Sequence, residues 1–283
     1  MATVTGSNKK SVVGRTALYV FVFLVCVAIL YPYLVMFVTS FTDLDQIYQI
    51  PPKVLPEVWN FRNYIDVWSV IPLSQFFANS LVVSIVSTLL CIVCAVPAAY
   101  AMTRMRFKGR GFFMRMVVVS QMFTAVVLLI GIFKVCVFLN IQDQLMSLIL
   151  VNAAFNQAFA IWILRGTFVT IPRELEQSAL IDGCNTVTAM VRIILPLAAP
   201  GVVTALIFVF ISAWNEYPVA MTLIGSTLKK TLTVGMRAFY GYIFIQWWYL
   251  FAVALMATVP VIILFTIIEK HLVGGLTAGG VKG

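Results

Sequence analysis

The segment ELEQSALIDGCNTVTAMVRIILPLAAP spans Glu174–Pro200 and is the longest part of the chain in which charged side chains recur at regular intervals. Long apolar runs lie before and after it. A charged, two-part amphipathic hairpin between two apolar runs is poorly suited to the lipid interior, where ionised side chains are costly. The segment therefore predicts a surface that docks onto another protein and transmits movement to membrane spans.

The first part of this segment is predicted to form a short acidic helix. Pro172 can begin it, because the amide hydrogen that proline lacks is one that stays unpaired at a helix start. Glu174 and Glu176 in the first turn complement the positive end of the helix dipole. The helix is expected to run to Asp182 and to end at Gly183, which accepts the left-handed conformation that most residues resist.

A second helix is predicted by an apolar stripe with helical spacing, and a proline ends its regular backbone before the next span. The stripe consists of Val187, Met190, Val191, Ile194 and Leu195. The residues expected to seat the hairpin, residues 172–196, on the bundle are Val187, Val191, Ile193, Leu195 and Pro196. An interfacial helix lying on lipid is the alternative. Such helices favour Lys and Arg on the polar side, whereas this segment is mainly acidic.

The whole chain is too apolar for a soluble domain. Its 283 residues are 62% hydrophobic and 10% charged, whereas soluble domains have about 45–50% apolar and about 25% charged residues. The net charge of +9 is distributed between apolar runs, so nucleic-acid binding is not expected. Cys91 and Cys94 have the spacing of a redox or zinc motif, but their run carries no charge and no His. They are interpreted as packing residues, and no metal site is expected.

Six apolar runs are each long enough for a membrane span, which needs roughly 20 mainly apolar residues. They cover about 17–39, 77–102, 112–137, 145–164, 198–220 and 247–268. The predicted fold class is an all-α integral membrane protein with six transmembrane helices. The predicted order is a cytoplasmic N-terminal tail (1–16), a first transmembrane helix (17–39), an outer loop (40–76), a five-helix core (77–270) that holds the hairpin 172–196, and a cytoplasmic C-terminal tail (271–283).

Lys and Arg residues indicate the orientation. With the N-terminus inside, thirteen of them fall on the cytoplasmic side and five on the outer side. Cytoplasmic loops carry an excess of these residues, so both termini are expected to be cytoplasmic.

Trp214, Asn215 and Glu216, at the end of the fifth span, are the candidates for a substrate path. Trp stacks on sugar rings, and Asn and Glu bind hydroxyl groups. Anchoring of Trp214 at the membrane interface and hydration of Glu216 explain these residues at least as well. They are therefore not expected to form the main substrate site.

The hairpin also carries a motif. ABC importer permeases of bacteria have Glu-Ala-Ala, three residues, Gly, nine residues and Ile-x-Leu-Pro in their last large inner loop. The pattern falls here on Gln177-Ser178-Ala179, Gly183 and Ile193–Pro196. Further matching segments are FANS (77–80), YA (100–101), RMRFKGR (104–110), AWNE (213–216) and GLTAGGVKG (275–283). The chain thus resembles the carbohydrate-uptake permeases of binding-protein-dependent importers, most of all the shorter permease of maltose-type systems.

The resemblance implies a type I ABC importer permease fold in a bacterial cytoplasmic membrane, and import of a sugar. It implies a second permease subunit, two ATPase subunits and an extracytoplasmic solute-binding protein as partners, beside the lipid membrane. The residues expected to couple to an ATPase are Glu174, Glu176, Gln177, Ser178, Ala179, Asp182 and Gly183. Gln177 and Ser178 replace the Glu and Ala of the family. The outer loop 221–246 corresponds to one that reaches into the binding protein in maltose-type systems.

The chain has no GxxxxGKS or GxxxxGKT loop, so it is expected to bind no cofactor and to leave ATP hydrolysis to partner subunits. The sequence leaves two alternatives. A self-sufficient secondary transporter or channel needs ionisable groups inside its spans, and only Arg115 and Lys134 lie in them, each near an end. A membrane enzyme needs converging catalytic groups, and the chain has a single His, His271.

Overall fold

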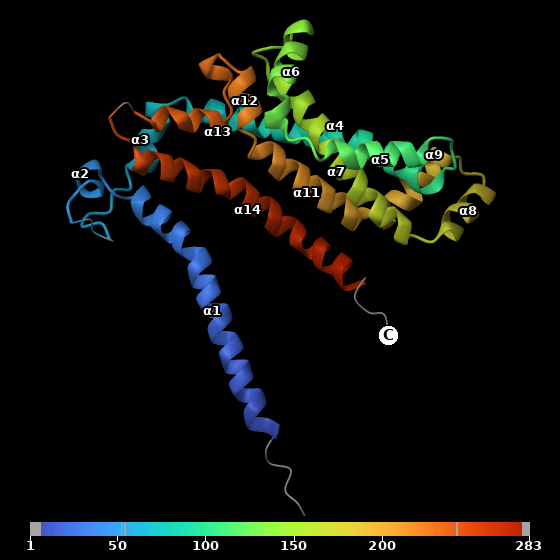
Figure 1. Ribbon diagram of the computed structural model, residues 1–283, viewed down its shortest axis with the longest axis horizontal. Coiled ribbons are helices and arrows are strands. Elements are labelled where there is room, and N and C mark those ends of the chain that lie inside the picture. The colour runs from blue at the N-terminus through green and yellow to red at the C-terminus, as the bar shows by residue number, and fades with distance from the viewer. Residues whose placement is uncertain (1–6, 52, 54, 242, 279–283) are drawn as a thin grey trace, which may run out of the picture. The chain divides into compact units, whose positions relative to one another are not determined.

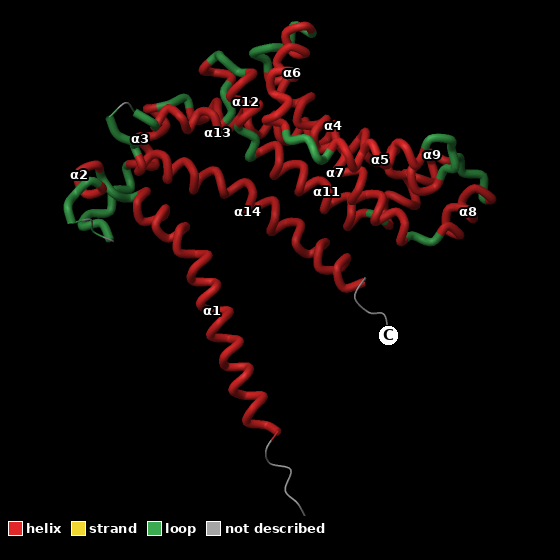
Figure 2. Tube along the Cα trace, viewed as in Figure 1, coloured by secondary structure: helices red, strands yellow, loops and turns green. Residues whose placement is uncertain are grey.

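The computed structural model describes residues 7–51, 53, 55–241 and 243–278, and side chains are described from residue 14 to residue 267 (Figure 1). These residues form helices and loops without a strand, as Figure 2 shows, which confirms the all-α prediction. The helices are α1 (Ser7–Ser40), α2 (Leu44–Ile47), α3 (Asn63–Val70), α4 (Leu73–Arg104), α5 (Arg110–Ser120), α6 (Ala125–Phe138), α7 (Leu145–Thr170), α8 (Arg173–Ile181), α9 (Thr186–Ala189), α10 (Leu195–Leu197), α11 (Ala199–Trp214), α12 (Pro218–Leu223), α13 (Leu232–Gly235) and α14 (Trp247–Ala278).

Four helices are long and apolar enough to cross a membrane unbroken, namely α1, α4, α7 and α14. Two further pairs of helices pass the same criterion together but are bent. The pair α5 and α6 is bent by 104°, and the α9–α10 segment meets α11 at 81°. The six predicted spans therefore correspond to four unbroken helices and two bent pairs.

The predicted third span, residues 112–137, is interrupted at residues 121–124. Polar side chains gather at this break and compete with the helix ladder for hydrogen bonds. The Ser120 hydroxyl donates to the Val117 carbonyl at 2.8 Å, and Thr124 begins α6 from an extended backbone conformation. A hydropathy pattern detects the apolar run, but it does not detect this local competition for backbone hydrogen bonds.

The chain divides into two compact units, residues 1–67 with 239–256 and residues 68–238 with 257–283. In the first unit, every described side chain of α1 from residue 14 to residue 35 is exposed. The loop after α1 is held by an aromatic cluster around Phe41, whose ring lies 5.0 Å from those of Phe37, Phe61 and Tyr64. The buried Asn63 amide donates to the carbonyls of Ser40 and Thr42 and closes this loop.

The second unit is built on α4, α7 and α11, which pack side by side. Its main core joins Ala95 and Ala99 of α4, Leu164 of α7 and Ala205 of α11. Small residues predominate at this contact, as they do where membrane helices approach closely. Helices α8 and α9 lie at one end of α7, and α12 lies near its other end (Figure 1).

The helices extend further than the predicted domain limits. Helix α1 begins at Ser7, inside the predicted N-terminal tail, and α14 continues to Ala278, inside the predicted C-terminal tail. The predicted outer loop 40–76 contains the two short helices α2 and α3 and the first turn of α4. Residues 1–6 and 279–283 of the two predicted tails lie outside the described residues.

Candidate functional sites at the inner hairpin and the outer loop

The hairpin has the predicted corner. Helix α8 ends at Ile181, and Gly183 has φ +89°, the left-handed conformation that a side chain would oppose. The amide of Gly183 donates to Leu180 O at 3.2 Å, and the amide of Cys184 donates to Ala179 O at 2.9 Å. These two bonds form a Schellman motif, which pairs the last carbonyls of the helix and fixes the direction of the chain beyond it.

The second arm of the hairpin begins at a proper cap but departs from the predicted stripe. The Asn185 side chain accepts from the Thr188 amide at 2.8 Å and starts α9. Residues Met190–Ile194 then form a π-helical turn, whose extra residue changes the phase of every later side chain. Val187 is 66% exposed and Val191 is 49% exposed, so these two do not seat the hairpin.

Other side chains of the second arm seat the hairpin on the core. Ala189 and Ile194 have no exposed surface, and Met190 and Leu195 pack on the same core. Of the remaining predicted seating residues, Ile193 is half-buried and Pro196 is exposed. Of the residues that pack on the core here, only Leu195 belongs to the set predicted to seat the hairpin.

A nearly buried ion pair fastens α8 to α4. The side chains of Arg104 and Glu176 are 5% and 12% exposed, and Arg104 Nε lies 3.2 Å from Glu176 Oε2. The Tyr100 hydroxyl donates to the other oxygen, Glu176 Oε1. Separating α8 from α4 would leave a buried charge without its partner, which is costly, so this contact holds α8 in one place.

The same region is tied together by arginine bonds to carbonyls. Arg104 Nη2 donates to Phe168 O at 3.1 Å and to Ile171 O at 2.7 Å, at the end of α7. Arg173 Nη2 donates to Thr103 O at 3.1 Å, at the end of α4. We call Tyr100, Arg104, Arg173 and Glu176 the inner clamp. It joins the ends of α4 and α7 to the start of α8.

The predicted ATPase-coupling residues are thus divided between two surroundings. Glu176 faces the inner clamp, Ala179 is buried, and the others are exposed, namely Glu174, Gln177, Ser178, Asp182 and Gly183. The hairpin also exposes apolar side chains, which the sequence did not predict to be exposed. We call these five residues, Leu175, Leu180, Ile181, Val187 and Val191, the apolar ridge, and Ile181 among them is 86% exposed.

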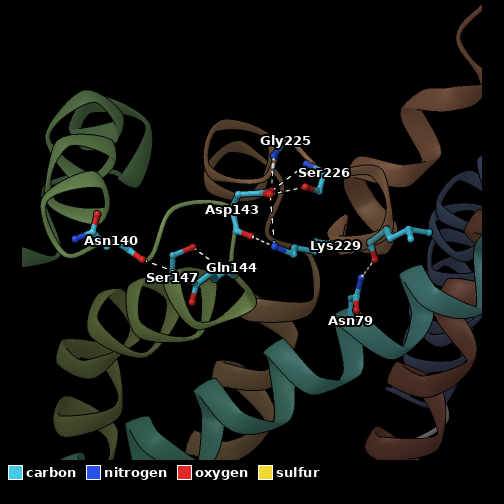
Figure 3. A network of polar contacts seen from close by, with 9 residues as sticks. Asn79, Asn140, Asp143, Gln144, Ser147, Gly225, Ser226 and Lys229 are labelled. Carbon is cyan, nitrogen blue, oxygen red and sulfur yellow. Dashed lines mark hydrogen bonds and ion pairs between the residues drawn. The ribbon is translucent and has the colours of Figure 1, made fainter.

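At the other end of α7, Asp143 holds the loop that follows α12 (Figure 3). Its Oδ1 accepts from the amides of Gly225 at 3.0 Å and Ser226 at 2.9 Å, and its Oδ2 accepts from the Ser226 hydroxyl. Lys229 Nζ donates to the Asp143 carbonyl at 2.6 Å. These bonds to the ionised form lower the pKa of Asp143 to about 2, with the Ser226 hydroxyl contributing most.

The same loop is held a second time from α4. Asn79 Nδ2 donates to Leu228 O at 2.8 Å and to Lys230 O at 2.9 Å, and Ser80 Oγ accepts from the Leu232 amide at 2.8 Å. We call Asp143, Asn79 and Ser80 with their partners in residues 225–232 the outer clamp. A side chain at Gly235 would lie 2.2 Å from the Phe76 ring, so only glycine allows this approach. This part of the predicted outer loop is therefore anchored to the bundle.

The substrate-path candidates have structural partners in this structure. The Trp214 side chain is 4% exposed, stacks on Phe210 and donates its Nε1 hydrogen to Ala257 O at 3.2 Å. Glu216 accepts from the amides of Val219 at 2.6 Å and Ala220 at 2.9 Å, which caps α12. Asn215 alone is exposed. The three side chains therefore do not converge on one site.

The structure adds contacts that no pattern predicted. With its amide turned to satisfy both atoms, Gln157 of α7 donates to Cys91 O at 3.2 Å and accepts from Ala95 N at 2.9 Å on α4. This contact lies just before Pro97, the position in α4 that has no amide hydrogen. The sequence indicates Arg104 as a topology signal and as part of the matching RMRFKGR segment, but not as the partner of Glu176. The opposite charges of the 104–110 loop and the acidic helix were the one available hint of its partner.

The structure also places the side chains of metal-binding residue types and the two cysteines with CxxC spacing. Among the described residues, no three His, Cys, Asp or Glu side chains are close enough to bind one metal ion. Cys91 is buried in the core, as predicted for a packing residue, but Cys94 is exposed.

Comparisons with known proteins agree on one family. Residues 92–277 match the family described as "Binding-protein-dependent transport system inner membrane component". The chain is 33% identical to the inner membrane ABC transporter permease protein YcjP of Escherichia coli (strain K12), over 98% of this chain and 100% of the relative. It is 30% identical to the trehalose/maltose transport system permease protein MalG of Thermococcus litoralis, over 97% of this chain and 99% of the relative.

A solved structure gives the same fold. The crystal structure of a bacterial ABC transporter involved in the import of alginate matches with a TM-score of 0.81 at 24% identity, over 95% of this chain and 99% of the matched chain. The match confirms the importer permease fold. The chain therefore belongs to the binding-protein-dependent transport system inner membrane component family, as a multi-pass permease of an ABC importer.

Proposed function

We propose that this permease imports a sugar, driven by ATP that partner subunits hydrolyse. Relatives that cover most of the chain carry sugars in their names, among them the sulfoquinovosyl glycerol permease SmoH of Agrobacterium fabrum at 34% identity and the diacetylchitobiose permease DasC of Streptomyces coelicolor at 31% identity. A second permease subunit would complete the translocation path. An extracytoplasmic binding protein would deliver the substrate at the end that carries the outer clamp.

The observation that carries this proposal is the hairpin. Its tip presents exposed Leu180 and Ile181 outside the apolar spans, while the inner clamp holds its base on α4 and α7. An apolar ridge rimmed by polar residues is typical of a protein-docking surface. A rigid base is needed if movement of the ridge is to move the spans.

In this proposal the hairpin is the part that an ATPase subunit moves. Closure of the two ATPase subunits around ATP would draw the hairpin with it, and the inner clamp would pass that displacement to α4 and α7. The change is a two-state transition biased by a ligand that binds another subunit. This chain would bind no nucleotide and no other cofactor. Both termini and the hairpin would lie on the cytoplasmic side, where most Lys and Arg residues fall.

The first experiment is a tagged purification from the native membrane in mild detergent, followed by mass spectrometry of the co-purifying subunits. We expect a second permease and an ATPase, and the binding protein encoded with them would give the substrate for uptake assays. A protein that purifies alone and transports without ATP would overturn the proposal in favour of a secondary transporter.

A matched pair of variants tests whether the ridge is the docking surface. Fully burying an isoleucine side chain contributes about 1.5–3 kcal/mol. Ile181→Ala is therefore expected to weaken ATPase association strongly. Ile130→Ala is the control, because Ile130 is 75% exposed on α6 and lies in an apolar span. Equal ATPase recovery with the two variants would place the docking surface elsewhere.

A further inference from the structure

A cavity of about 490 Å³ lies beside the inner clamp, between the ends of α4 and α7 and the starts of α5 and α8. Three arginines line it, Arg104, Arg110 and Arg173, together with a single carboxylate, Glu174. The cavity is distinct from the apolar ridge of the hairpin. Its lining includes none of the ridge residues.

The three guanidinium groups keep donors for a ligand. A guanidinium carries five N–H donors in a fixed plane. The bonds of Arg104 and Arg173 to carbonyls use only Nη2 of each side chain. Among the described residues, no side-chain hydrogen bond or ion pair involves Arg110. The Nε of Arg104 is also buried without a hydrogen bond, although Glu176 lies close to it.

The charges favour an anion. Glu176 balances Arg104 and Glu174 balances one of the other two arginines, which leaves a surplus of one positive charge among these five groups. The cavity also meets the N-termini of α5 and α8, whose unpaired amides and dipoles favour negative charge. Arginine is the side chain best suited to bind phosphate, because its plane offers two parallel hydrogen bonds.

The apolar surroundings identify the source of the phosphate. Val169 lines the cavity and is itself exposed, and Phe112 and Phe113 follow Arg110 on α5 with their side chains exposed. Helix α5 is the first half of a bent span, so these side chains lie where a membrane helix meets water. Basic pockets between membrane helices on the cytoplasmic side bind anionic lipid headgroups, with the acyl chains along apolar surfaces nearby.

We propose that this cavity binds the phosphate of an anionic phospholipid, so that one lipid links α5 to the inner clamp. Arg110 is the residue that makes this contact without another role in the described structure. The proposal of a lipid site depends on the location of the chain in a membrane. It does not depend on which substrate is imported or on where the ATPase binds.

The test is native mass spectrometry of the purified transporter complex in detergent, stripped of lipid and then titrated with phosphatidylglycerol or phosphatidylcholine. We expect phosphatidylglycerol to be retained in preference. Near a membrane surface one basic residue contributes about 1 kcal/mol, so Arg110→Gln is expected to weaken retention about fivefold. Arg110→Lys keeps the charge without the paired hydrogen bonds, so its lipid retention is expected to lie between that of wild type and that of Arg110→Gln.

The control is Arg115→Gln on the same helix, because Arg115 is exposed and does not line the cavity. It is expected to leave retention unchanged. Equal losses from Arg110→Gln and Arg115→Gln would overturn the proposal, because the binding would then be diffuse. Displacement of the lipid by glycerol phosphate at equal concentration would also overturn it and would identify a site for soluble phosphates. A third result would also overturn the proposal, namely lipid retention only after the ATPase subunits are removed. The cavity would then be part of the subunit contact.

Discussion

Glu176 fastens α8 near one end of α7, and Asp143 holds the loop after α12 near the other end. The surroundings of the two carboxylates differ. The side chains of Glu176 and its partner Arg104 are 12% and 5% exposed, whereas those of Asp143 and its partner Lys229 are 35% and 47% exposed. Removing one partner of a buried pair costs about 3–5 kcal/mol, and an exposed pair contributes about 0–1 kcal/mol. The inner clamp is therefore a rigid link, whereas the Asp143 contact can be broken at small cost while Asn79 and Ser80 still hold the same loop.

Loss of Glu176 should have the largest effect. Glu176→Ala leaves the Arg104 guanidinium buried beside an unpaired Tyr100 hydroxyl, and we expect destabilisation of about 3–5 kcal/mol. The thermal midpoint of the purified permease should fall, and less ATPase should co-purify with it. Glu174→Ala is the control for the thermal midpoint alone, because Glu174 is exposed and a surface substitution of this kind changes stability by about 0.5 kcal/mol or less.

A double-mutant cycle with Arg104→Gln and Glu176→Gln separates the pair from its other contacts. If the clamp acts as a unit, the two substitutions will be far from additive. Additive effects would show that α8 is held by packing alone, and the contrast between the two ends of α7 would then disappear.

Gly183→Pro comes next in expected size. At φ +89° the corner excludes the φ of about −65° that proline requires, and proline also removes the amide that donates to Leu180 O. We expect a cost of about 3 kcal/mol, confined to the hairpin. Uptake should be lost while membrane insertion stays intact. Gly183→Asn should retain transport, because Asn tolerates the left-handed region, and a loss equal to that of the proline variant would refute the corner as the cause.

Asn79→Ala tests the buried half of the outer clamp. Asn79 is 4% exposed, and its amide pairs the carbonyls of Leu228 and Lys230. Each of these two hydrogen bonds contributes about 0.5–1.5 kcal/mol. Hydrogen exchange should quicken at the amides of residues 228–232 and stay unchanged in α8. The control is Gln75→Ala, since Gln75 contacts Asn79 but not the loop. Unchanged exchange in the loop would show that Asp143 and Ser80 hold it without Asn79.

Sequence patterns predicted the elements that are determined by residues close together in the chain. The six apolar runs, the acidic helix and the left-handed Gly183 each follow from residues within a few positions of one another, and the structure has all of them. The bend between α5 and α6 was missed, because polar residues at the break are too few to alter an apolar average. The π-helical turn at Met190–Ile194 was missed because a 3.6-residue period was assumed to continue.

The contacts that make the sites are long-range, and no local pattern predicts them. Tyr100 and Glu176 are 76 positions apart, and Asp143 and Ser226 are 83 positions apart. A carboxylate beside a short turn can cap either its own turn or a distant loop. Asp143 has φ +53° in its turn, but its carboxylate caps the loop after α12. A carboxylate beside a turn offers the same signal in both cases, so only the packing of α7 against α12 decides its partner.

Asp143→Asn should have a small effect at neutral pH. Asn keeps the left-handed backbone and one acceptor for the Gly225 and Ser226 amides, and it loses the second acceptor and the exposed Lys229 pair. We expect about 0–1 kcal/mol and slightly faster exchange of these two amides. Asp45→Asn, which removes an exposed charge elsewhere, is the control. A large loss of stability would mean that the outer end of α7 is as rigid as the inner end.

The depressed pKa of Asp143 also gives this contact a pH dependence. The folded pKa is about 2, below the value of 3.8 for an isolated aspartate, so the stabilisation is present in full above about pH 4. It is lost as the pH falls through the folded pKa toward 2. Protection of the Ser226 amide should therefore be constant from pH 8 to pH 5 in wild type, and a transition within that range would contradict the assigned bonds.

Gln177→Glu should have the smallest effect of all. Gln177 is exposed beside the buried Glu176, so a carboxylate at position 177 keeps its water and has no buried partner to lose. It restores the residue that the resembled family carries, and exposed substitutions of this kind change stability by about 0.5 kcal/mol or less. ATPase recovery and uptake should match wild type. A loss of ATPase association with normal stability would locate the subunit contact at position 177 itself. The two neighbouring residues would then divide the work, with Glu176 holding the hairpin on the bundle and Gln177 matching a partner that has adapted to an uncharged side chain.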